Sequence, residues 1–293
     1  MVNPPRKARM FGTKLSKSSS AVVTGAGSGI GRAFALELAA RGGRVICSDI
    51  QLAAAEETVA LIEARGGKAL ALACDVSKLE EVEALAAKSE QWLGNPVDLV
   101  VNNAGVGIGG RPIGVIPIED WHWTVGVNLW GVVHGCHVFA PRLRALGRGG
   151  IINVCSAASF ATAPMMGPYN VTKAAVLALS ETLEAELVGT GVRVTALCPT
   201  FVKTNIVRDG RIPEGTSKVG SRLMAWTGVS PESVVKTTLD ALDAHRLYVL
   251  PQLEARLIWR MKRLAPVAYN KSSGLLGRMF APRDAKGADH GAS

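Results

Sequence analysis

The chain has 293 residues, of which 48% are apolar, and this is enough for a sizeable core in one large domain or two small ones. Charge, Gly or Pro interrupts every apolar run well before the about 18 residues that a membrane-spanning helix needs, so an integral membrane protein is not expected. The formal net charge of +9 is concentrated at the two ends, so any role of this charge is expected there, and no nucleic-acid partner is predicted.

The first 17 residues form a basic, Ser-rich arm that we expect to be a flexible, solvated tail. The five cysteines are odd in number, scattered, and mostly embedded in apolar runs such as Val45-Ile46-Cys47. We expect them to be small buried hydrophobic residues in a reducing compartment, and the predicted location is cytoplasmic.

Short β-branched runs then alternate with longer segments of helical period, which is the pattern of βαβ units and a parallel sheet. Strands are predicted at 21–23, 44–47, 69–72, 99–101, 150–154, 193–197 and 247–250. Helices are predicted at 32–40, 53–65, 79–92, around 121–138 and at 172–188. The fold class is therefore α/β, a single Rossmann-like doubly wound domain over about residues 18–250, with about seven parallel strands flanked by helices.

Residues 205–228 fall outside this repeat because they are rich in Gly and charge and have no strong period. A long irregular segment after a late strand is expected to be a substrate lid. It precedes a well-marked helix start at Ser230-Pro231-Glu232, with Ser as the cap and Pro at the first helical position.

Residues 251–293 are expected to be a basic amphipathic C-terminal extension with a helix. One face of this helix carries Leu253, Leu257, Ile258, Met261 and Leu264, and another carries Arg256, Arg260 and Arg263. Three interpretations are open: packing over the substrate cleft or a subunit neighbour, peripheral contact with an anionic membrane, or nucleic-acid binding. The apolar stripe and Trp259 favour the first.

A glycine-rich turn, Thr24-Gly25-Ala26-Gly27-Ser28-Gly29-Ile30-Gly31, follows the first predicted strand and opens onto helix-forming residues. Glycines let a backbone approach a pyrophosphate, and a helix N-terminus offers free N–H groups and a partial positive charge. Asp49 ends the second strand about 20 residues later, where a carboxylate can accept hydrogen bonds from ribose hydroxyls and repel a 2′-phosphate. The turn and the acid together predict NAD(H) rather than NADP(H) as the cofactor.

The glycine spacing fits Thr-Gly-x-x-x-Gly-x-Gly, at Thr24, Gly25, Gly29 and Gly31. Further motifs follow in order: Asn102-Asn103-Ala104-Gly105, and Ser156 thirteen residues before the run Tyr169-Asn170-Val171-Thr172-Lys173. With these motifs, the sequence resembles the short-chain dehydrogenase/reductase family over about residues 18–250.

The resemblance implies a catalytic set of Asn128, Ser156, Tyr169 and Lys173. It also implies that the cofactor is bound by Gly25, Ser28, Gly29, Ile30, Gly31, Asp49, Asp75, Val76, Asn102, Ala104, Gly105, Tyr169, Lys173, Pro199, Val202 and Thr204. One departure is Thr200, which follows Pro199 where the family usually has Gly. The path of this loop and the shape of the adjoining substrate space therefore do not follow from the family pattern.

The spacing of Tyr169 and Lys173 has a chemical reason, because residues four apart share one face of a helix. An unperturbed Tyr titrates near pH ~10, and a nearby cation together with the positive nicotinamide ring is expected to lower that pKa. Tyr169 would then take the proton of an alcohol while hydride leaves the same carbon, and in reverse it would protonate a ketone. The resemblance implies that Ser156 holds the substrate oxygen and that Asn128 orders a relay water.

The positions expected to face the substrate are mainly apolar: Ala158, Phe160, Met165, Met166, Leu223, Met224 and Trp226. They predict a hydrophobic secondary alcohol or the matching ketone. No metal site is predicted, because His122, His134 and His137 fit no zinc spacing.

Family resemblance also implies a homodimer or a homotetramer. The main rival hypothesis is a catalytically silent, cofactor-sensing regulator or a membrane-surface binding protein on the same fold. The intact Ser156, Tyr169 and Lys173 argue against the silent regulator.

Overall fold

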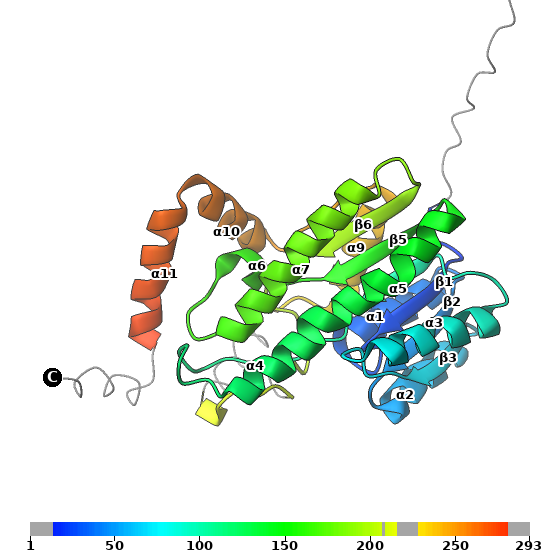
Figure 1. The fold of residues 1–293 in the computed structure, drawn as a ribbon, viewed down its shortest axis with the longest axis horizontal. Helices are drawn as coiled ribbons and strands as arrows, with labels where there is room; N and C mark the ends of the chain where they lie inside the picture. The colour runs from blue at the N-terminus through cyan, green and yellow to red at the C-terminus, as the bar shows by residue number, and fades with distance from the viewer. Residues whose placement is uncertain (1–13, 207–208, 216–227, 281–293) are drawn as a thin grey trace, which may run out of the picture.

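The computed structural model describes residues 14–206, 209–215 and 228–280. Within these residues, seven parallel strands form one sheet in the order β3-β2-β1-β4-β5-β6-β7, with helices on both faces (Figure 1). The strands are β1 Ser20–Thr24, β2 Arg44–Asp49, β3 Lys68–Ala73, β4 Leu99–Asn102, β5 Gly149–Val154, β6 Val192–Leu197 and β7 Tyr248–Val249. The strand order reverses between β1 and β4, and doubly wound sheets bind nucleotides at that point. The predicted Rossmann-like fold is confirmed.

The helices connect the strands and continue past the last one. They are α1 Gly29–Ala40, α2 Leu52–Glu63, α3 Leu79–Leu93, α4 Ile118–Val125, the π-helical turn η1 Gly126–Trp130, α5 Gly131–Leu146, α6 Ala158–Ala161, α7 Gly167–Glu186, α9 Pro231–Asp243, α10 Leu253–Leu264 and α11 Pro266–Phe280. The predicted cap of α9 is present, since the Ser230 hydroxyl accepts a hydrogen bond from the Ser233 N–H (3.3 Å).

Two hydrophobic cores lie on opposite faces of the sheet because side chains alternate along each strand. In β1, Val22 packs into the core that α3, α5 and α7 cover, whereas Ala21 and Val23 pack into the core that α1, α2 and α9 cover. All three side chains are fully buried, as both-sided coverage of a parallel sheet requires.

The helix that carries Tyr169 and Lys173 begins earlier than predicted. Its expected start was residue 172, but α7 begins at Gly167, with Pro168 in its first turn. Pro is tolerated there because the first helical N–H groups have no partner within the helix, so Gly167-Pro168 forms the start of the helix.

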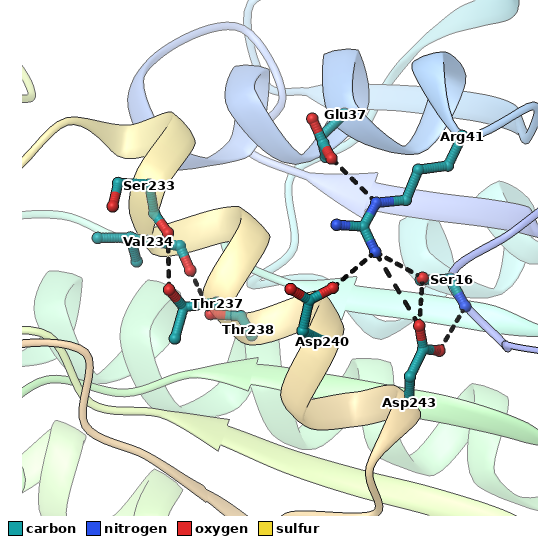
Figure 2. Close-up of polar contacts among 9 residues, drawn as sticks. All are labelled: Ser16, Glu37, Arg41, Ser233, Val234, Thr237, Thr238, Asp240 and Asp243. Carbon is teal, nitrogen blue, oxygen red and sulfur yellow. Dashed lines mark hydrogen bonds and ion pairs between the residues drawn. The ribbon is translucent and has the colours of Figure 1, made fainter.

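Hydrogen bonds attach the first residues that the structure describes to α9. Ser16 is fully buried, and its N–H and hydroxyl donate to the two carboxylate oxygens of Asp243 (3.0 and 2.7 Å). Arg41 donates to Ser16 (2.8 Å), to Asp240 (3.2 Å) and to Glu37 (2.9 Å), which links α1 to α9 (Figure 2). The boundary predicted after residue 17 is therefore too late for Ser16. Residues 1–13 of the predicted arm lie outside the described residues.

Replacing Arg41 by Met should lower the free energy of unfolding by about 1–3 kcal/mol, because charge-assisted hydrogen bonds are lost beside the buried Asp243 carboxylate. Urea unfolding followed by circular dichroism measures this. The matched control is Arg65→Met, at an exposed Arg just after α2, which should change stability by less than about 0.5 kcal/mol. Equal losses in both variants would contradict the role given to Arg41.

The C-terminal helices α10 and α11 lie at the periphery, beyond α6 (Figure 1). α10 contacts the body through Trp259, whose ring centre lies 5.0 Å from that of Phe160 and 5.1 Å from that of Tyr248. Of the predicted apolar stripe, Ile258 packs against the core, while Leu253, Leu257, Met261 and Leu264 are exposed. Packing over the protein body therefore accounts for Ile258 and Trp259 but not for the rest of the stripe.

No helix in the described part of the chain is long and apolar enough to cross a membrane.

Candidate active site

A cavity of about 410 Å³ opens at the carboxyl ends of the central strands, and the turn between β1 and α1 forms one wall. Gly25 has a φ of +63°, and a Cβ there would lie 2.8 Å from Ala104 Cα. A Cβ on Gly31 would lie 2.1 Å from the Gly25 carbonyl oxygen. Only glycine fits these two positions. Gly25, Ser28, Gly29 and Ile30 line the cavity, so the N-terminus of α1 is available to an anionic group.

Asp49 lines the same cavity at the end of β2. Its two carboxylate oxygens accept hydrogen bonds from the N–H groups of Gly27 (2.9 Å) and Gln51 (3.0 Å), which fix the carboxylate beside the glycine-rich turn. A fixed negative charge here can accept hydrogen bonds from ribose hydroxyls and disfavours a 2′-phosphate.

The basic side chains of Arg32 and Arg44 both have partners, and Arg32 also donates to the Gly27 carbonyl in the glycine-rich turn. Arg32 pairs with Glu57 on α2 (2.9 Å), and Arg44 lies over the Trp92 ring, 4.6 Å from its centre. Neither Arg32 nor Arg44 lines the cavity.

Of the asparagine pair at the end of β4, one side chain lies in the core and the other lines the cavity. Asn102 is 3% exposed, and its amide donates to Asn153 Oδ1 (2.9 Å), behind the cavity wall. Asn103 lines the cavity and donates to the carbonyl oxygens of Thr24 (2.8 Å) and Gly25 (3.2 Å). Successive side chains of an extended segment point to opposite sides, so only one of the pair reaches the cleft. Sequence analysis named Asn102, and the structure places Asn103 there.

Three members of the predicted catalytic set meet in this cavity. Ser156 follows β5, and Tyr169 and Lys173 lie in the first two turns of α7. Lys173 is 3% exposed, its Nζ lies 5.8 Å from the centre of the Tyr169 ring, and it donates to the Val154 carbonyl oxygen (2.8 Å). The four-residue spacing therefore brings the phenol and the ammonium group to one wall of the cavity.

Burial shifts the pKa values of both Tyr169 and Lys173. Desolvation raises the pKa of Tyr169, and a hydrogen bond with the Ser156 side chain opposes that rise. Desolvation lowers the pKa of Lys173. The expected lowering of the Tyr169 pKa, which depends on the positive nicotinamide ring as well as on Lys173, stays a prediction. At neutral pH the phenol is protonated and can donate.

Asn128, the fourth member, lies in the π-helical turn η1 and is fully buried. Its Oδ1 accepts from the Val106 N–H (2.7 Å), and its Nδ2 donates to the Val106 carbonyl (2.9 Å). Asn128 does not line the cavity, but its two hydrogen bonds hold Val106, which lines the cavity. Its part in a proton relay stays a prediction, although π-helical turns recur at functional sites.

Most of the other predicted cofactor residues line the cavity, namely Asp75, Val76, Ala104, Gly105, Pro199, Val202 and Thr204. Gly31 is an exception, because it packs beneath the Gly25 carbonyl and supports the turn from within.

The four predicted substrate residues that the structure describes do not line the cavity. Phe160 is 7% exposed, because α6 turns it into the core beneath Trp259. Ala158 donates its N–H to Ser156 Oγ (3.2 Å), and the Met165 carbonyl accepts from the Gly110 N–H (2.8 Å). Met166 is half-buried, and neither it nor the other three lines the cavity. Leu223, Met224 and Trp226 lie outside the described residues.

The described part of the predicted lid is held against α4. The Arg211 N–H donates to the Gly107 carbonyl (3.0 Å), and its guanidinium pairs with Asp120 (2.7 Å). The same guanidinium lies 4.1 Å from the centre of the Trp123 ring, and Trp123 lines the cavity. Arg211 therefore positions this segment beside an aromatic wall of the cavity.

Sequence analysis also missed part of the lining, namely Ile50, Cys74, Asn103, Val106, Gly107, Trp123, Val127, Val154, Cys155, Thr200, Asn205, Ile206 and Asp209. Trp123 lies on a helix that showed only a packing pattern. Four of the others, Ile50, Cys74, Asn103 and Cys155, directly follow a strand, and that position was the one signal that could have found them.

Thr200, the residue that departs from the family pattern, connects the cavity to the C-terminal extension. Its hydroxyl donates to Glu254 Oε1 (2.8 Å), and its N–H donates to Gln252 Oε1 (3.2 Å). Gln252 in turn donates to the Phe201 carbonyl (3.2 Å). The start of α10 is thus attached to the loop that lines the cavity, through a side chain that glycine lacks.

Thr200→Val should lower the free energy of unfolding by about 0.5–1.5 kcal/mol, because it removes the hydroxyl donor to Glu254 and keeps the shape. It should also speed tryptic cleavage within α10, since that helix loses an attachment. Thr182→Val is the control, because the exposed Thr182 hydroxyl bonds only within its own helix (3.0 Å, to Ala178). Equal cleavage rates in wild type and Thr200→Val would show that the bond does not hold α10.

Comparison with known proteins supports the family that the sequence motifs indicate. The sequence pattern of the short chain dehydrogenase family matches residues 19–214. The chain is 38% identical over 263 residues to "Probable oxidoreductase EphD" of Mycobacterium tuberculosis (86% of this chain, 44% of that protein). It is 35% identical over 260 residues to 1-deoxy-11-beta-hydroxypentalenate dehydrogenase of Streptomyces exfoliatus (85% and 92%). The chain thus spans less than half the length of the mycobacterial relative.

Solved structures give the same result. A short chain dehydrogenase/reductase from Burkholderia phymatum in complex with NAD superposes with a TM-score of 0.81 at 33% identity, covering 86% of this chain and 95% of that one. The LigD apo form from Sphingobium sp. strain SYK-6 gives 0.74 at 27% identity, with coverage of 86% and 97%. The chain belongs to the short-chain dehydrogenase family of oxidoreductases.

Proposed function

We propose that the protein interconverts a hydrophobic secondary alcohol and its ketone with NAD(H). The observation that carries this proposal is the shared cavity, where Ser156, Tyr169 and Lys173 lie together with the glycine-rich turn and Asp49. A proton donor and a nucleotide-binding turn in one cavity are the two parts that such a reaction needs.

The residues of the cavity suit a dinucleotide. The turn from Gly25 to Ile30 would hold the pyrophosphate at the N-terminus of α1, and Asp49 would hold a ribose. The Asp49 carboxylate, held by the N–H groups of Gly27 and Gln51, favours NAD(H) over NADP(H). When bound, this cofactor would accept or deliver the hydride.

Tyr169 would perform the proton chemistry. As a neutral phenol it donates a proton to the oxygen of a ketone during reduction, and as a phenolate it takes the proton of an alcohol during oxidation. The Ser156 hydroxyl lies beside it and would position the reacting oxygen. A positive charge close to the phenol favours the phenolate, so the Lys173 ammonium would assist oxidation if it moved from the Val154 carbonyl toward Tyr169.

The substrate is proposed to be apolar because Val106, Trp123 and Ile206 line the cavity. The Streptomyces relative is named a dehydrogenase of a hydroxypentalenate, and this name supports a substrate that carries a hydroxyl group.

The test is a panel of apolar secondary alcohols with NAD⁺ or NADP⁺, followed by absorbance of the reduced cofactor. We expect NADH formation with at least one alcohol, and slower formation of NADPH. Calorimetric binding of NAD⁺ without turnover of any alcohol or ketone would instead favour the silent regulator.

We also propose a homodimer or homotetramer. Trp130 in η1 and Val171 in α7 are each 51% exposed, which offers an apolar contact on the long helices. Light scattering of the purified protein tests this. The cytoplasm is the proposed compartment, on the basis of five buried cysteines without a disulfide.

A further inference from the structure

The two C-terminal helices expose seven large apolar side chains, which we call the leucine face. They are Leu253, Leu257, Met261, Leu264, Val267, Leu275 and Leu276, with exposed fractions of 67, 49, 52, 85, 67, 64 and 57%. α10 contacts the body through its other side, where Ala255, Ile258 and Trp259 are buried or half-buried. A helix that packs on one side and exposes leucines on the other leaves an apolar surface available to a partner.

The leucine face is also hollowed. A groove of about 550 Å³ runs between α10 and α11, and Met261, Leu264, Ala268, Tyr269 and Leu276 line it. Pro164 forms its floor on the side of the body, where a Cβ on Gly277 would lie 2.8 Å from the Pro164 side chain. α11 therefore rests on the body at its C-terminal part and leaves the groove apolar.

The charge of these helices is strongly positive. Their basic residues are Arg256, Arg260, Lys262, Arg263, Lys271 and Arg278, and their one acidic residue is Glu254. The Glu254 carboxylate accepts a hydrogen bond from Thr200 at the body. Arg260, Lys271 and Arg278 are exposed and form no ion pair with a residue that the structure describes. An anionic surface is the complementary partner.

From these observations we propose that α10 and α11 bind the surface of an anionic lipid bilayer. The leucine face enters the boundary between headgroups and acyl chains, and the neighbouring arginines and lysine contact the lipid phosphates. A second copy of the chain fits less well, because burying two leucine faces against each other would bring two strongly basic clusters together. This binding is independent of the proposed reaction.

Co-sedimentation of the full chain with lipid vesicles tests the proposal. Wild type should bind phosphatidylcholine vesicles that contain phosphatidylglycerol at least about tenfold more tightly than pure phosphatidylcholine, because each cation near an anionic surface adds attraction. Added salt should weaken that binding.

Two variants separate the apolar from the ionic contribution. Leu257→Ser with Leu264→Ser should weaken vesicle binding at least about tenfold, since two inserted side chains lose their apolar burial. Arg260→Gln with Lys271→Gln should also weaken binding to the anionic vesicles about tenfold, and it leaves the apolar side chains in place as a second test if the serine variant folds poorly. Val188→Ser is the matched control, because Val188 is an apolar side chain exposed by 76% elsewhere, and it should bind like wild type.

Three results would overturn the proposal. The first is wild-type protein that remains in the supernatant with phosphatidylglycerol vesicles, and the second is sedimentation of the variants like wild type. The third is a lower molar mass of the serine variant by light scattering with unchanged vesicle binding, which would assign the leucine face to a second copy of the chain. Circular dichroism establishes that each variant is folded.

Discussion

Tyr169→Phe is expected to lower turnover by about 10²–10⁴-fold, which is the usual contribution of a positioned acid or base. The change removes one oxygen and keeps the ring, so the fold and NAD⁺ binding should remain. The rate of NADH formation with the best alcohol of the panel measures turnover, and calorimetry measures NAD⁺ binding.

Tyr269→Phe is the matched control for this variant. Tyr269 lies on α11 and lines the groove of the leucine face, away from the active-site cavity. It should keep the wild-type rate, because the hydroxyl that it loses does not line the active-site cavity. Retention of more than about a tenth of the activity by Tyr169→Phe would remove the proposed acid/base role.

Asp49→Ser should shift the ratio of kcat/KM for NAD⁺ to kcat/KM for NADP⁺ by about 10²-fold toward NADP⁺. Each hydrogen bond to a charged group contributes about 1.5–3 kcal/mol, and about 1.4 kcal/mol corresponds to a factor of ten. Loss of the negative charge also removes repulsion of a 2′-phosphate. Serine can still accept the Gly27 N–H, so the glycine-rich turn should persist.

The control for cofactor choice is Asp75→Ser. Asp75 lines the same cavity, and its Oδ1 accepts from both the N–H (3.0 Å) and the hydroxyl (2.7 Å) of Ser77. This variant should bind both cofactors more weakly with little change in their ratio. An unchanged ratio in Asp49→Ser would mean that another group selects the cofactor.

The fold was predictable from local pattern because a parallel sheet covered on both faces needs continuous apolar strands separated by helices of regular period. Every predicted strand is present with its ends within two residues. The start of α7 was misplaced because Pro168 suits either a turn or a first helical turn, and only tertiary packing decides between them.

The cavity wall was less predictable than the fold. Tyr169, Lys173, Ser156 and the glycine-rich turn have fixed local spacing, and they meet as expected. Phe160 did not follow its apolar pattern into the cavity, because α10, far along the chain, provides Trp259 as its partner. Contacts between distant segments of this kind leave no local sequence signal.

The direction of the Tyr169 pKa also depended on tertiary structure. Sequence spacing revealed the neighbouring cation but neither the degree of burial nor the Val154 carbonyl that receives the Lys173 ammonium. Desolvation is the largest cause of the raised pKa of Tyr169.

The dependence of kcat/KM on pH, measured for wild type in both directions, tests the acid/base role of Tyr169 most directly. Oxidation of the alcohol needs the phenolate, so its kcat/KM should rise about tenfold per pH unit until the pH passes the pKa of Tyr169. Reduction of the ketone needs the neutral phenol, so its kcat/KM should fall above the same pKa. A flat profile in both directions, or the same rise in the residual activity of Tyr169→Phe, would contradict the account.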